Sequence, residues 1–293
     1  MKGRYGVKRI IAFLVVLLLL MSAGCGQKVE KRVVDGSVEF TAETLPKICA
    51  TAYTKDAAVN VVVAALGVDS ATALSLITVC GSSDECYQKL MTSECDIVLA
   101  HSYGIKVANE LLDMPHPIVE TELNKDALVF ITNGLTGIEG LTKEQIVSLY
   151  KAEITDWKDV GGSELSVTLF GNRKNSDSRA AFERFFGDEL PENVVNKSVL
   201  TEKGEFQTEL QYDNRNGALG YTLLSRVEKN PTAAVKLMAV DGTTPTAENI
   251  ESGKYPFKVS VLASMRGGYG ENDNEVVFYR WLIGEQGRKV MGY

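Results

Sequence analysis

Short apolar runs of strand length alternate with helix-like segments along most of this chain, and that alternation limits the possible folds more than any other feature. The strand-like runs lie at 47–53, 74–80, 95–101, 126–133, 165–170 and 255–265. Helical segments are expected at 55–67, 84–94 and 274–293. Because helices placed between strands bury both faces of a sheet, this order predicts an α/β fold with mainly parallel sheets.

The N-terminal 25 residues have the pattern of a bacterial export signal. Four basic residues precede twelve apolar residues at 10–21, and small residues then lead directly to Cys25. A membrane-spanning helix needs roughly 20 apolar residues, so this run is short for a permanent anchor. Small residues before a cysteine resemble the lipobox of bacterial lipoproteins. We therefore expect residues 1–24 to be a signal peptide and Cys25 to carry lipid; an ordinary signal with an incidental cysteine is the alternative.

The mature chain is acidic. Residues 1–24 carry four positive and no negative charges, so their removal moves the formal charge from −7 to −11. Nucleic-acid binding needs a broad basic face, and this composition offers none. Residues 25–40 are polar and charged and suit a tether between lipid and domain. The remaining length is sufficient for two lobes or one large core.

Four further cysteines follow Cys25. They are Cys49, Cys80, Cys86 and Cys95. An even number in an extracytoplasmic chain permits two disulfides with three possible pairings, or buried thiols. Their spacing does not match common zinc sites, and the chain has only two histidines. We expect no metal and no cofactor.

The stretch GNRKNSDSRAAFERFF at 171–186 places basic residues around a Ser-Asp-Ser step, directly before a helical apolar pattern. Ser176 or Asp177 is expected to cap that helix. The same loop could instead form one side of a small anion site, because a helix start concentrates about half a positive charge. Lys174 and Arg179 are expected to be either solvated charges or an additional source of positive charge for that anion site.

Three segments resemble the substrate-binding lipoproteins of phosphate ABC transporters. They are LTKEQIVSLYKAEITDWKDVGG at 141–162, NGALGY at 216–221 and DGTTPTAENIESGKYPF at 241–257. In the first, Thr142 and Gln145 also have the spacing of a capping box. The resemblance implies a monomeric binding protein, not an enzyme, that closes on phosphate or a related oxyanion and presents it to ABC permease subunits in the membrane.

The resemblance also implies the fold and its division. The family has the type II periplasmic-binding-protein-like fold, in which two α/β lobes are joined by two crossing strands and the ligand lies between them. On this chain, lobe 1 would comprise residues 41–132 and 257–293, and lobe 2 residues 133–256. Periodicity alone could not indicate that the terminal helix returns to the first lobe.

Two loops would hold the ligand. In lobe 1 the resemblance points to the hydroxyls of Thr51 and Thr54, just before a helix. In lobe 2 it points to Ser176 and Ser178, with Arg173 as the charged partner, since a guanidinium can donate two hydrogen bonds to one oxyanion.

The chain departs from the family at several of these positions. Asp177 stands where the family has glycine, so it either repels a dianion or points outward from the first helical turn. Arg173 lies three residues before Ser176, where the family's arginine lies four before, and Asn172 has that place. His101 replaces an acidic residue and would donate to a ligand, unless it is simply a partly exposed histidine at a strand end.

Two other functions stay open. A diverged relative could bind another anion or small solute, or act as a sensor or interaction protein with a vestigial cleft. An enzyme is disfavoured because the chain has no G-x-S-x-G, H-E-x-x-H or Walker motif. A nucleophile–base pair of Cys95 and His101 would require both side chains within hydrogen-bond reach.

Overall fold

The structure is a computed structural model of the 293-residue chain and describes residues 32–34, 38–173, 175–190, 199–200, 217–229 and 231–293. The expected signal peptide, Cys25 and most of the tether lie outside the described residues, as does Lys174. Within the tether region, strands β1 (Arg32–Val34) and β2 (Val38–Phe40) pair antiparallel. No described helix has the length and apolar character needed to cross a membrane.

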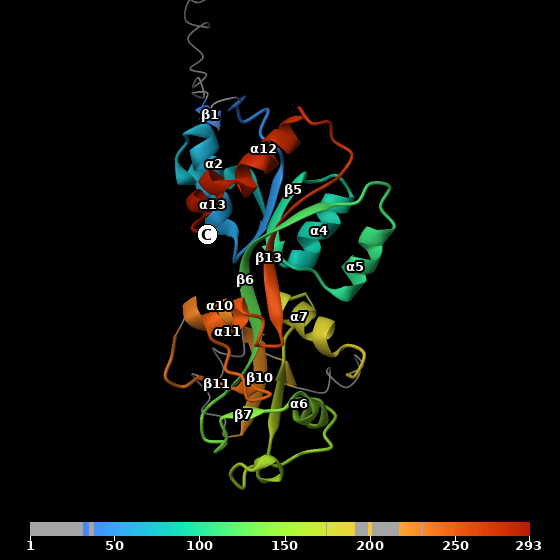
Figure 1. Cartoon of the computed structure of the whole chain (residues 1–293), viewed down its shortest axis with the longest axis vertical. Coiled ribbons are helices and arrows are strands. Elements are labelled where there is room, and N and C mark those ends of the chain that lie inside the picture. Colours follow the sequence, from blue (N-terminus) through green and yellow to red (C-terminus); the bar gives the residue numbers. More distant parts are fainter. Residues whose placement is uncertain (1–31, 35–37, 174, 191–198, 201–216, 230) are drawn as a thin grey trace, which may run out of the picture.

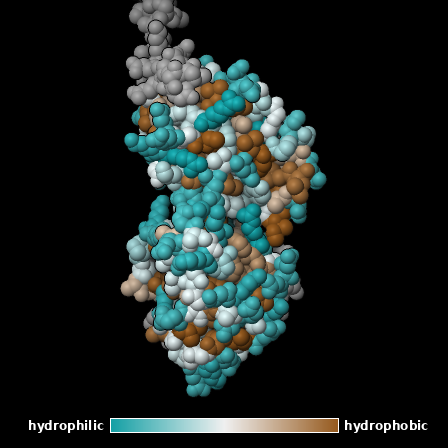
Figure 2. All heavy atoms as spheres, in the orientation of Figure 1, coloured by the Kyte–Doolittle hydropathy of each residue, from teal (hydrophilic) through white to brown (hydrophobic). Residues whose placement is uncertain are grey.

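The described chain forms two halves, each packed on its own apolar residues (Figure 1). We call them lobe 1 and lobe 2. Lobe 1 contains strands β3 (Ile48–Thr51), β4 (Ile77–Cys80) and β5 (Ile97–His101) and helices α2 (Lys55–Leu66), α3 (Ser70–Ser75), α4 (Ser83–Met91), α5 (Ile105–Leu112), α12 (Asn274–Ile283) and α13 (Glu285–Met291). On the face seen in Figure 2, many of the residues at the narrow waist between the halves are hydrophilic.

Lobe 2 is built around a second set of strands. Its elements are β7 (Gly140–Leu141), α6 (Lys143–Tyr150), η1 (Trp157–Val160), β8 (Thr168–Gly171), α7 (Asp177–Phe186), β9 (Val199–Leu200), β10 (Ala218–Leu223), α10 (Leu224–Lys229), β11 (Lys236–Leu237), β12 (Ala239–Val240) and α11 (Ala247–Glu251). Two long strands, β6 (Val119–Thr132) and β13 (Lys258–Met265), pass between the lobes (Figure 1).

The lobe 1 sheet is covered on both faces because successive residues of a strand point to opposite sides. Ile48 and Ala50 of β3 pack with α2, α12 and α13, whereas Cys49 between them packs with α4 and α5. The same alternation holds along β5, where Leu99 and Val98 belong to opposite faces. This confirms the α/β layering predicted from the sequence.

The sheets are mixed rather than mainly parallel. Strand β3 runs parallel to β4 and β5, but β13 runs antiparallel to both β5 and β6, and β6 antiparallel to β10. The physical reason is that β6 and β13 carry the chain in opposite directions between the lobes. Each contributes to both cores, with Leu123 and Ala263 in lobe 1 and Phe130 and Val259 in lobe 2.

Several elements differ from the sequence expectation. The strand expected to begin at residue 126 starts at Val119, since β6 pairs with β13 over this extra length. The run 74–80 is only partly strand, because Asp69 accepts two backbone N–H groups and starts α3. The terminal helix is broken at Gly284, whose extended backbone separates α12 from α13. The sequence pattern does not predict helix α5.

The four cysteines lie together in the lobe 1 core between the sheet and helices α4 and α5. All four are buried free thiols. The Cys95 thiol donates to the Cys86 carbonyl oxygen at 3.8 Å. Among the described residues, no group of three or more His, Cys, Asp or Glu side chains is arranged to hold a metal ion.

Candidate functional site

Two helix starts, one from each lobe, face each other at the waist. Helix α4 begins after β4, and its cap Ser82 accepts the Glu85 N–H at 3.2 Å. Helix α7 begins after β8, and its cap Ser176 accepts the Arg179 N–H at 3.2 Å. The two helices contact each other. Unpaired N–H groups and helix dipoles from both lobes therefore favour negative charge here.

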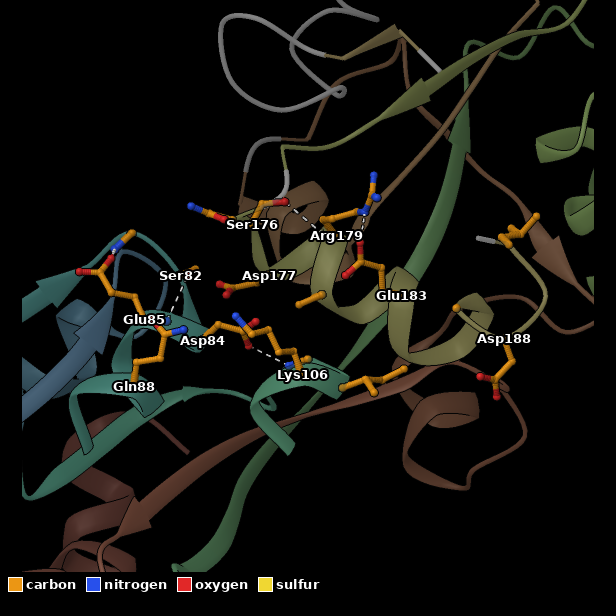
Figure 3. A pocket seen from close by; sticks show the side chains of 17 residues that line it. Ser82, Asp84, Glu85, Gln88, Lys106, Ser176, Asp177, Arg179, Glu183 and Asp188 are labelled. Carbon is orange, nitrogen blue, oxygen red and sulfur yellow. Dashed lines mark hydrogen bonds and ion pairs between the residues drawn. The ribbon is translucent and has the colours of Figure 1, made fainter. Parts of the chain in front are cut away.

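The side chain between these helix starts is Asp177. Figure 3 shows it projecting from α7 toward the loop that carries Ser82. Its Oδ1 accepts the Ser83 N–H at 2.7 Å, and its Oδ2 lies 3.7 Å from His101 Nδ1 and 3.8 Å from the Arg226 guanidinium. With 5 % of its surface exposed, Asp177 does not point outward. Burial alone would raise its pKa, but His101 and Ser83 lower it to about 2.

His101 supplies positive charge on the lobe 1 side. It ends β5, is 1 % exposed and packs against the Tyr53 ring at 4.5 Å between centroids. Its Nε2 lies 3.0 Å from Asp126 Oδ2. Burial would lower its pKa, but the two nearby carboxylates raise it to about 9, so the ring is charged at neutral pH. The expectation of a partly exposed histidine is wrong.

Asp126 is itself held by several donors. Its carboxylate accepts the Ser225 hydroxyl at 2.5 Å, the Ser225 N–H at 3.1 Å and the Ala127 N–H at 2.7 Å. Its pKa is lowered, because His101 and these hydrogen bonds outweigh the effect of burial. Asp126 therefore fixes the orientation of the His101 ring and leaves Nδ1 directed at the Asp177 side of the site.

Two buried donors next to Asp177 make no hydrogen bond to any described residue. They are Ser83 Oγ and His101 Nδ1, and Nδ1 is held only by its 3.7 Å ion pair with Asp177. A buried polar group left without a partner costs roughly 1 to 3 kcal/mol. A carboxylate has two oxygens, whereas a tetrahedral oxyanion has four. The site therefore has more donor capacity than Asp177 uses.

A cavity of about 900 Å³ opens beside Asp177 between α4, α5 and α7 (Figure 3). Five carboxylates and two cations line it. These charged residues are Asp84, Glu85, Asp177, Glu183, Asp188, Lys106 and Arg179. The Asp84 carboxylate accepts the Gly104 N–H at the start of α5 at 2.8 Å. Asp177 is thus one of the residues that line this cavity.

The threonines predicted in lobe 1 are buried at the start of α2. Thr54 Oγ1 accepts the Thr51 N–H at 3.0 Å and donates to the Leu99 carbonyl oxygen, so its hydrogen-bonding capacity is used within the lobe. Thr51 Oγ1 lies 3.3 Å from Thr54 Oγ1. Thr54 is the N-cap residue of α2, although its side chain makes no capping hydrogen bond.

The predicted residues of lobe 2 are dispersed around the start of α7. Ser178 is buried in the first turn, and the Ser176 hydroxyl donates to the Arg173 carbonyl oxygen at 2.9 Å. The Arg173 side chain is exposed. Arg179 is not solvated, which differs from one of the two expectations for it. It is 1 % exposed, because its side of α7 packs onto lobe 2, and its Nε donates to Glu183 at 2.5 Å.

Of the predicted site residues, the structure brings His101 and Asp177 into one cluster. Sequence reasoning missed its other members, Ser83, Asp126 and Arg226. The serines of CGSSDE at 80–85 precede a helix after a strand, and that signal could have identified Ser83. Nothing local in the sequence identifies Arg226. The hypothetical Cys95–His101 pair is not formed, since the thiol contacts Cys86 and the ring contacts Asp126.

Comparison with known proteins supports the same architecture. The sequence model of the PBP superfamily domain matches residues 28–269. The phosphate-binding protein PstS of Borreliella burgdorferi is 24% identical over 184 residues, which are 59% of this chain and 63% of that protein. The chain thus spans less than two thirds of that relative's length in this match.

Solved structures of phosphate-transport proteins have the same fold. An ABC-type phosphate transport receptor from Vibrio cholerae aligns with a TM-score of 0.64 at 20% identity, covering 84% of this chain and 97% of that one. A putative phosphate ABC transporter substrate-binding protein from Clostridium perfringens, solved with bound phosphate, aligns with a TM-score of 0.57 at 20% identity, covering 83% and 95%.

Proposed function

The chain belongs to the PBP superfamily, a family of binding proteins rather than enzymes, and we propose that it is the solute-binding component of an ABC importer. Its ligand is inorganic phosphate or a related oxyanion, bound between the lobes and delivered to membrane permease subunits. The pattern around Cys25 supports attachment by lipid at the extracytoplasmic face of the cell membrane. We also propose that lobe 1 comprises residues 41–132 and 257–293 and that lobe 2 comprises residues 133–256.

One observation carries the oxyanion assignment: the site already binds an oxyanion group, the Asp177 carboxylate. The Ser83 N–H donates to it, and His101 and Arg226 bring two positive charges within 4 Å. The Ser83 hydroxyl and His101 Nδ1 make no hydrogen bond to any described residue, and Nδ1 has only its 3.7 Å ion pair with Asp177, so both can donate to a ligand with more oxygen atoms. Thr51, Thr54, Arg173, Ser176 and Ser178 remain proposed residues of the surrounding loops.

Isothermal titration calorimetry tests this function. The protein is the mature chain with the Cys25→Ser substitution, and phosphate, sulfate and molybdate are each titrated into it. We expect saturable binding of at least one oxyanion at one site. Arg226→Gln should weaken it about tenfold or more, because a charged hydrogen-bond or ion-pair partner is worth about 1.5 to 3 kcal/mol. Arg280→Gln, an exposed arginine of α12, is the matched control and should change nothing. Absence of heat with every oxyanion would contradict the assignment.

A diverged family member that binds another small solute is the second candidate, and the excess of carboxylates around the cavity favours it. A ligand with a positive group would be attracted to this lining, whereas a phosphate dianion would be repelled. Binding of a cationic or zwitterionic solute with no response to any oxyanion would select this candidate.

A further inference from the structure

The contacts of Asp177 come from both lobes. Asp177 lies on α7 of lobe 2, whereas Ser83 starts α4 and His101 ends β5, both in lobe 1. The Asp177 carboxylate bonds to the Ser83 N–H and lies within 4 Å of the His101 ring. Arg226 reaches the same carboxylate from α10 of lobe 2. Closure of two lobes on a ligand requires contacts of this kind, made from both sides to one group.

The carboxylate is also nearly sealed from solvent. Asp177 is 5 % exposed and His101 is 1 % exposed, so the interaction between them is poorly screened by water. The neighbouring Asp126 neutralises one of the two cations. The four residues His101, Arg226, Asp126 and Asp177 together carry two positive and two negative charges. Without Asp177, the other three have a net positive charge.

We propose that Asp177 is an internal ligand, which holds the lobes closed in the absence of solute and competes with any external oxyanion for the same donors. This inference rests on the proposed function for the identity of the competing ligand. The lobe-closing role rests on the contacts alone. An incoming oxyanion gains the Ser83 N–H, His101 and Arg226 only when the Asp177 carboxylate leaves them.

The cavity beside Asp177 is the place from which an external oxyanion would replace the Asp177 carboxylate. It borders Ser82, Ser176 and Asp177, so a solute that enters it lies next to both helix starts and to Asp177. Displacement would move Asp177 toward Asp84 or toward solvent. Asp84 already has a raised pKa, because burial and then the charge of Asp177, among other carboxylates, disfavour its ionised form. The acidic cavity thus opposes departure of Asp177 and favours the self-bound form.

The test compares the mature Cys25→Ser chain with versions that also carry Asp177→Gly or Asp177→Asn. Asp188→Asn is the matched control, since Asp188 is an exposed carboxylate of the same cavity that makes no contact with Ser83 or His101. Circular dichroism checks folding, and the asparagine variant preserves an acceptor for the Ser83 N–H should glycine disturb α7. Small-angle X-ray scattering measures lobe closure, and titration with inorganic phosphate measures affinity.

Without phosphate, both Asp177 variants should have a larger radius of gyration than the parent chain and the Asp188→Asn control. With phosphate they should contract, and their dissociation constants should be at least about tenfold lower than that of the parent, because no charged internal carboxylate has to leave the donors before phosphate binds them. An unchanged radius in both Asp177 variants would overturn the internal-ligand role. Variants that open but bind no oxyanion would uphold it and overturn the proposed ligand class instead.

Discussion

At the scale of single residues, the charge of His101 depends on its two carboxylate neighbours. Burial of an imidazole by itself favours the neutral ring, yet Asp126 at 3.0 Å and Asp177 at 3.7 Å reverse that preference. The ring therefore carries a positive charge at neutral pH and connects strand β5 of lobe 1 to β6 and α7. The Tyr53 ring covers it from one side.

This environment predicts how stability changes with pH. The pKa of His101 is raised from its ordinary value of 6.5 to about 9, so its contribution is complete below about pH 6.5 and is lost as pH rises through about 9. We expect the difference in unfolding free energy between the parent and His101→Gln to shrink by about 3 kcal/mol from pH 6 to pH 10. Urea titrations at several pH values measure it.

The contribution of Asp177 to stability changes only at acidic pH. The lowered pKa of Asp177, about 2, means that its stabilising contribution is present above its ordinary pKa and is lost only as pH falls toward 2. The loss between pH 6 and 10 is therefore assigned to His101. A difference between parent and His101→Gln that stays constant over that interval would show that the ring is neutral in the native state.

The sequence could indicate His101 and Asp177 as site residues, but not what they do. An aspartate in the first turn of a helix gains from the helix dipole whether it points outward or inward. The contacts with His101, Ser83 and Arg226 determine that Asp177 points inward, and these residues lie 76, 94 and 49 positions away in the sequence. No local pattern reports such contacts, which is why Asp177 could be expected to face solvent.

Among helices and strands, local sequence patterns predicted the structure well where all the interacting residues are neighbours in the sequence. The capping box read from Thr142 and Gln145 is present: Thr142 Oγ1 accepts the Gln145 N–H at 3.2 Å, and Gln145 Oε1 accepts the Thr142 N–H at 2.8 Å. Strand limits were less predictable, because β6 starts at Val119 only through its pairing with β13. That partner is more than 125 residues away.

The capping box gives a test that is independent of the ligand site. Thr142→Ala removes the hydroxyl acceptor for the Gln145 N–H and should lower the free energy of unfolding by about 1 kcal/mol. Thr142→Ser retains the acceptor and is the matched control, expected to stay close to the parent chain. Chemical denaturation measures both, and equal losses in the two variants would contradict a capping role for the hydroxyl.

At the scale of the whole molecule, two lobes meet at one small charged cluster. Periodicity predicted the α/β layers, but only the family resemblance implied that the chain returns to lobe 1 after β13, where α12 and α13 pack on the same core as α2. The order of strands and the antiparallel crossing arise from contacts between distant segments. Local sequence patterns carry little information about either.

Asp177 occupies the place that we assign to an external oxyanion between the lobes. The most direct measurement is a crystal structure of the Asp177→Gly chain grown with inorganic phosphate. We predict phosphate at the position of the missing carboxylate, within hydrogen-bond distance of the Ser83 N–H and His101 Nδ1 and beside Arg226. A phosphate bound elsewhere, or closed lobes with that position taken by no anion, would contradict the account.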